Sequence, residues 1–110
     1  LYDLLHPDCV FISPVVHTPQ EGREITYAYL RAANKALSED FQYVREVVQD
    51  NHAVLEFTVK VDGVFVNGVD IITFEGDQIV ELKVMVRPLK AVNAVWKQMG
   101  EMLEQLKAAS

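Results

Sequence analysis

Asp70 is the residue of this sequence whose setting most favours chemistry. It lies within 64–74, an apolar stretch typical of a β-strand. Successive side chains of a strand point to opposite faces, and the residues on the face of Asp70 are mostly apolar. A carboxylate buried among them must be hydrogen-bonded, paired with a charge, or neutral with a raised pKa. We predict that it points inward; the alternative is an outward carboxylate, turned by a bulge at Gly68. The residues that share its face are Val64, Val66, Gly68, Ile72 and Phe74.

Two other side chains could take part in chemistry. His17 follows the first predicted strand, and an imidazole exchanges protons near neutral pH. Beside Asp70 or a substrate it would complete an acid–base pair; the alternative is an exposed loop histidine. Cys9 lies in an apolar run, so we interpret it as a small buried hydrophobe rather than a nucleophile. No spacing typical of a metal site or of a phosphate-binding glycine loop is present, so no cofactor is expected.

The segments that must position these residues predict an α+β domain. The last four strands are joined by short turns such as Asp62-Gly63, which makes them an antiparallel meander. Thr18 and Glu21 form a capping box for one helix, and Pro88 opens another, whose apolar stripe includes Trp96. The predicted strands are 9–16, 41–49, 52 or 53 to 61, 64–74 and 78–87, with helices from about 18 to 37 and from 88 onward.

Alternation along the meander marks an apolar inner face, which we expect to hold a small apolar molecule. In the last strand, Val80 and its alternate residues face inward, and Ile79 faces outward with Met85. The candidate ligand-binding residues are Ser13, Leu55, Phe57, Val59, Val66, Leu82, Val84 and Val86.

The outer face of the same sheet is half apolar, because Phe65, Val69 and Ile71 lie there beside Met85. An apolar outer face favours packing against a second copy of the chain, so we expect a homodimer.

Bulk composition excludes several classes of partner. The net charge is −6 and the cationic residues are scattered, so no nucleic-acid partner is expected. No apolar run approaches the roughly 20 residues of a membrane span. The single cysteine suits a reducing compartment, and we expect a soluble, cytoplasmic domain. The chain begins in a segment, 1–5, that is typical of a helix end.

The order of elements resembles the nuclear transport factor 2-like superfamily, which includes ketosteroid isomerases, limonene-epoxide hydrolases and SnoaL-like polyketide cyclases. The resemblance implies an α+β cone-shaped roll over 1–110, with a strongly curved antiparallel sheet packed on helices around a pocket, and commonly a dimer. The first long helix of that family has no counterpart in this sequence. The segments that carry the resemblance are 5–14, 21–25, 67–74 and 78–84.

The resemblance implies a role for Asp70, which matches the protonated aspartate that donates a hydrogen bond to the oxyanion in ketosteroid isomerases. Their proton-abstracting aspartate corresponds to Ser13, before Pro14, and a serine hydroxyl is not a base unaided. Their oxyanion tyrosine belongs to the first helix. The epoxide hydrolases use two aspartates, and the second of them would fall near Met85, where this sequence has no carboxylate. Neither mechanism is therefore expected unchanged.

Two hypotheses follow from the sequence. The chain is a small isomerase, cyclase or hydratase that acts through Asp70, assisted by His17 or Ser13. Alternatively, it is a non-catalytic protein that binds an apolar ligand by shape, with Asp70 orienting that ligand.

Overall fold

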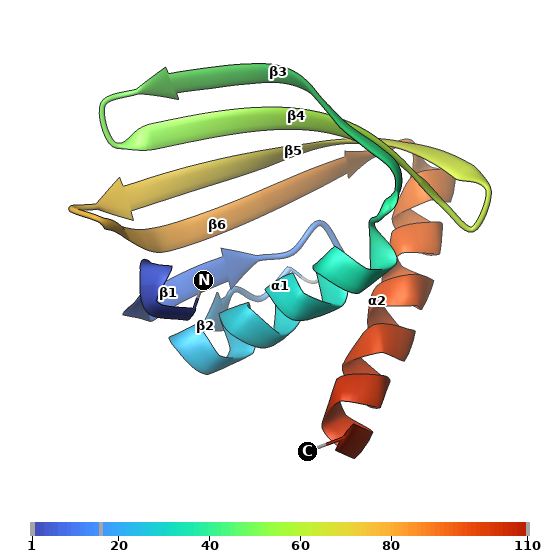
Figure 1. The fold of residues 1–110 in the computed structure, drawn as a ribbon, viewed down its shortest axis with the longest axis horizontal. Coiled ribbons are helices and arrows are strands. Elements are labelled where there is room, and N and C mark those ends of the chain that lie inside the picture. Colours follow the sequence, from blue (N-terminus) through green and yellow to red (C-terminus); the bar gives the residue numbers. More distant parts are fainter. Residues whose placement is uncertain (1, 16, 110) are drawn as a thin grey trace.

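A curved six-stranded sheet arches over the first helix, and the second helix lies across one end of it (Figure 1). The computed structural model describes residues 2–15 and 17–109. The elements are a 3-10 turn η1 (Tyr2–Leu4), strands β1 (Leu5–Ile12) and β2 (Gln20–Glu21), helix α1 (Arg23–Ala36), strands β3 (Glu39–Gln49), β4 (His52–Val61), β5 (Val64–Glu75) and β6 (Gln78–Arg87), and helix α2 (Leu89–Ala109).

The sheet has the order β2-β1-β6-β5-β4-β3. Strands β3 to β6 form the predicted antiparallel meander, and β1 joins its β6 edge in parallel. The α+β class and the curved sheet are confirmed. Within the described part of the chain, no helix is both long and apolar enough to cross a membrane.

The first strand differs from its prediction at both ends. It begins at Leu5 and ends at Ile12, so it includes Pro7. Proline has no N–H to donate to a neighbouring strand. The pairing of β1 with β6 is irregular between Leu5 and Val10, and this break accommodates the proline.

The start of α1 was also predicted too early. Residues 20–21 do not begin the helix but pair with β1 as the short strand β2. Gly22 then turns the chain with a φ of 110°, and its N–H donates to the Cys9 carbonyl oxygen at 2.8 Å. Backbone pairing with the sheet thus replaces the predicted capping box, and the helix begins at Arg23.

The predicted outward position of Ile79 is wrong. Thr73 pairs with Glu81 and Phe74 pairs with Ile79, so the register shifts by one residue near Val80. A one-residue shift reverses the face of the side chains before it. Ile79 is therefore buried, in a cluster with Leu5 and Cys9 against α1.

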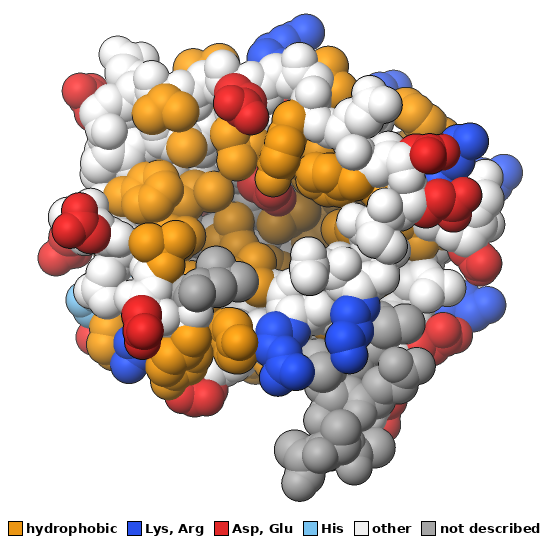
Figure 2. All heavy atoms as spheres, viewed as in Figure 1, with side chains coloured by type: hydrophobic (Ala, Val, Ile, Leu, Met, Phe, Trp, Pro, Cys, Tyr) orange, Lys and Arg blue, Asp and Glu red, His pale blue; other side chains and the backbone are white. Residues whose placement is uncertain are grey.

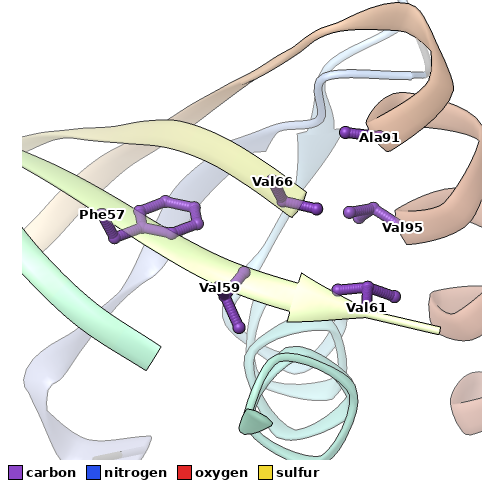
Figure 3. Packing of buried hydrophobic residues seen from close by; sticks show 6 residues of the cluster. All are labelled: Phe57, Val59, Val61, Val66, Ala91 and Val95. Atoms are coloured by element: carbon purple, nitrogen blue, oxygen red, sulfur yellow. The ribbon is translucent and has the colours of Figure 1, made fainter. Parts of the chain in front are cut away.

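The core is divided between the two ends of the concave face. One cluster joins β4 and β5 to α2, as Figure 3 shows, and the other packs β1 and β6 against α1. Cys9 belongs to the second cluster and is fully buried, as a small hydrophobe would be. The buried members of the α2 cluster are Phe57, Val59, Val61, Val66, Ala91 and Val95.

Candidate active site

A cavity of about 740 Å³ opens between the concave face of the sheet and the two helices. This volume lies in the range of small-molecule sites. Figure 2 shows the hollow, with hydrophobic side chains around it and an acidic side chain inside. Asp70 is the acidic residue among the described residues that line it. The apolar and aromatic residues that line the cavity include Phe11, Tyr29, Leu30, Phe41, Phe57, Val84, Val86 and Trp96.

Asp70 lies in the middle of the sheet, between Leu55 of β4 and Val84 of β6. The β4–β5 register is continuous from His52–Thr73 to Val61–Val64, so no bulge turns the carboxylate outward. Among the residues described, none donates a hydrogen bond to this carboxylate or forms an ion pair with it. Burial without such a partner raises the pKa of Asp70 from 3.8 to about 6.

This pKa makes Asp70 a competent acid–base group. A side chain that gains and loses a proton near neutral pH is best suited to transfer protons in catalysis. Its apolar surroundings also strengthen any hydrogen bond that a ligand makes with it.

Tyr43 of β3 is one of the further polar residues that line the same cavity, and it was missed by the sequence analysis. Tyr43 is 53% exposed; its partial burial raises the pKa of its phenol, and so do the negative charges of Asp70 and Glu46. Its phenol therefore stays protonated and can donate a hydrogen bond. The sequence carried a signal for Tyr43, because it alternates with Phe41 along one predicted strand and both side chains should therefore point to the same face. In the structure, their rings meet edge to face with centroids 5.0 Å apart.

Comparison with known proteins decides the family. The sequence profile of the SnoaL-like domain matches residues 1–82. The chain belongs to the SnoaL-like family.

Solved structures agree with this assignment. The SnoaL-like chain superposes on a steroid delta-isomerase from Pseudomonas aeruginosa with a TM-score of 0.91 and 36% identity, covering 97% of this chain and 80% of that one. The match to a Silicibacter pomeroyi protein with a cystatin-like fold has a TM-score of 0.84 and 33% identity, and it covers 91% of this chain and 71% of that one. A protein described as a putative SnoaL-like polyketide cyclase, from Jannaschia sp. CCS1, shares the fold with a TM-score of 0.67 and 18% identity. The match covers 84% of this chain and 74% of that one. No curated protein sequence is significantly similar to the chain.

The SnoaL-like fold brings Ser13 to the cavity that Asp70 lines, but it does not bring His17 there. Ser13 lines the cavity, and its Oγ accepts a hydrogen bond from the Val15 N–H at 3.0 Å. His17 is exposed and is not among the described lining residues, so the predicted pair of His17 and Asp70 is not formed.

The predicted apolar contacts divide between cavity and core. Phe57, Val84 and Val86 line the cavity. Val59 and Val66 share the inner face but are buried beneath α2. Leu55, opposite Asp70, and Leu82, which is buried and pairs with Ile72, are also outside the lining.

Two aromatic residues of the helices line the cavity. Trp96 of α2 is 59% exposed and lines the cavity, although its position in the apolar stripe indicated burial. Tyr29 of α1 lines it as well and stacks on Phe11 at 4.7 Å. The helix stripe identifies the side that faces the sheet, but part of that side covers empty space.

Proposed function

We propose that this SnoaL-like domain binds an apolar carbonyl compound and moves a proton on it through Asp70, as an isomerase or cyclase does. The observation that carries the proposal is a carboxylate with a pKa of about 6 in a largely apolar cavity, without a hydrogen-bond or ion-pair partner among the described residues. The 36% identity to a protein described as a steroid delta-isomerase supports this class of substrate.

In this proposal the ionised Asp70 takes a proton from the carbon next to the carbonyl. The electrons of that C–H bond move into the carbonyl and form an enolate, whose oxygen accepts a hydrogen bond from the Tyr43 hydroxyl. Protonated Asp70 then returns the proton to carbon and is regenerated. Asp70 thus acts as the base, because Ser13 occupies the position where the resemblance places one.

Proton exchange with solvent tests the proposal without knowledge of the natural substrate. A β,γ-unsaturated ketosteroid incubated with the protein in D₂O should gain deuterium at the carbon beside its carbonyl, as NMR detects. Because the carboxylate is the active form, the rate should rise as pH rises through about 6 and then level off. A rate that falls above this pH would contradict the role of Asp70 as base.

The second candidate function is non-catalytic binding. It is favoured by the absence of another carboxylate among the described lining residues. Trp96 is the single tryptophan of the chain and lines the cavity, so a bound ligand should change its fluorescence. A saturable change without deuterium incorporation would establish binding alone.

We also propose that the outer face of the sheet binds a second copy of the chain. Phe65 and Met85 are 59% and 49% exposed there, beside a shallow groove of about 340 Å³. The same face carries charges of both signs, including Arg45 and Glu56 at 3.2 Å. A two-fold related copy would meet apolar side chains with apolar side chains and could pair opposite charges.

Substitution of Phe65 by lysine should convert this dimer to a monomer, because it places a charge on the apolar surface that the second copy would cover. Sedimentation velocity should show the mass halved. Leu89→Lys, at an exposed position of α2, is the matched control and should leave the mass unchanged. A wild-type chain that sediments as a monomer would contradict the proposal.

A further inference from the structure

The ring of Phe57 occupies the space where a side chain of residue 68 would lie. A Cβ atom on Gly68 would be 2.5 Å from Cζ of Phe57 and 2.9 Å from Cε2, closer than real Cβ atoms approach. It would also be 3.0 Å from the Met85 carbonyl oxygen. Gly68 is therefore needed for the close approach of a side chain, and not for a bulge or turn.

The position of this ring is held from two sides. Phe57 of β4 pairs directly with Gly68 of β5, so its ring lies against the β5 backbone (Figure 3). Its other neighbour is Phe41, whose ring stacks on it at 5.4 Å with an interplanar angle of 16°. Phe57 is only 2% exposed, yet it lines the cavity. If the Phe57 ring were pushed away from Gly68, it would move into the cavity, which is the open space beside it.

Gly68 is also next to the reacting group. Gly68 and Asp70 are alternate residues of β5, so they point to the same face, about 7 Å apart along the strand. Across β6, Val86 pairs with Gly68 and Val84 pairs with Asp70, and both valines line the cavity. The Phe57 ring thus forms the cavity wall in the row beside the carboxylate.

We propose that Gly68 sets the depth of the cavity beside Asp70 and so selects bulky, multi-ring apolar molecules over small ones. The absence of a side chain lets the Phe57 ring lie close to the β5 backbone, which leaves room for a large ligand to reach the carboxylate. The inference rests on the proposed function only in placing the ligand in this cavity; it requires binding and not turnover.

Gly68→Ala is the test, with ligand affinity read from Trp96 fluorescence. The probes are a fused-ring ketosteroid and a single-ring ketone, acetophenone. The added methyl group should push the ring into the cavity and weaken ketosteroid binding by about tenfold or more, the scale of an overpacked site. Acetophenone affinity should change less than about twofold, because a small ligand still fits.

Gly68→Ala/Phe57→Leu provides the rescue, since a leucine side chain is smaller than the aromatic ring it replaces and removes the clash. The double variant should restore ketosteroid affinity to near the wild-type value. An equal loss for both probes, or no rescue, would overturn the proposal and leave Gly68 a purely structural residue. If Gly68→Ala does not fold, Phe57→Leu alone should increase the preference for the ketosteroid, and an unchanged preference would overturn the proposal.

The outcomes separate this inference from the proposed function. Size selection that responds to Gly68 without deuterium exchange would support the cavity wall and contradict catalysis. If the wild type exchanges deuterium but Gly68→Ala does not change the selectivity for ligand size, the result would support catalysis and contradict the role of Gly68. A wild-type chain that binds neither probe would contradict both.

Discussion

Replacement of Asp70 by asparagine is expected to lower the rate of deuterium exchange by about 10²- to 10⁴-fold, the usual contribution of a positioned acid–base group. Asparagine has nearly the same shape but cannot accept the proton, so the cavity and the affinity for apolar ketones should persist. The measurement is the exchange rate by NMR, with binding followed separately by Trp96 fluorescence.

Two matched variants define the specificity of that loss. Asp77→Asn changes an exposed carboxylate in the turn between β5 and β6, and it should leave exchange unchanged. Tyr43→Phe removes one hydrogen bond to the enolate oxygen and should reduce the rate by about tenfold, less than the loss of the base. Full activity in Asp70→Asn would refute the proposed mechanism.

The same Asp70→Asn substitution is expected to stabilise the fold by about 2 to 3 kcal/mol at pH 8. The pKa of Asp70 is 3.8 when unfolded and about 6 when folded, so between these values the native state binds more protons than the unfolded state. The contribution of Asp70 to stability therefore falls as pH rises from about 4 to 6, and the full cost of its buried charge remains above pH 6. Asparagine carries no charge and avoids this cost.

Chemical denaturation at pH 4 and pH 8 measures this effect. The stability difference between Asp70→Asn and the wild type should be largest at pH 8 and should nearly vanish at pH 4, where the wild-type carboxyl is protonated in the folded chain. Asp77→Asn should show no such pH-dependent gain. A variant less stable than the wild type at pH 8 would mean that the charged form of Asp70 is favoured by the fold.

These two predictions describe one trade-off. A buried carboxylate that has no partner among the described residues is expected to destabilise the chain at neutral pH, and the same burial gives it a pKa suited to proton transfer. Stability gained together with activity lost is thus the signature expected of a functional, and not a structural, Asp70.

Local pattern was enough for much of the fold. The boundaries of β4 and β6 and the antiparallel meander follow from alternation and tight turns, because these depend on neighbours in sequence. The inward direction of Asp70 follows for the same reason: the register of β5 with β4 is unbroken around it. Where pairing is irregular, as near Val80, alternation predicted the wrong face for Ile79.

The extent of the cavity depends on contacts that are distant in sequence. Alternation places Phe57, Val59 and Val66 on one face, but α2 covers the two valines while Phe57 meets open space. Likewise, a helical stripe gave no reason to separate Trp96 from core residues. Whether an inward side chain packs or lines a pocket depends on sheet curvature and on where the helices cross, and neither can be read from neighbouring residues. Alternation along one strand was therefore enough to predict that Asp70 faces inward, whereas the cavity that it faces exists only because the curved sheet and the two helices leave space between them.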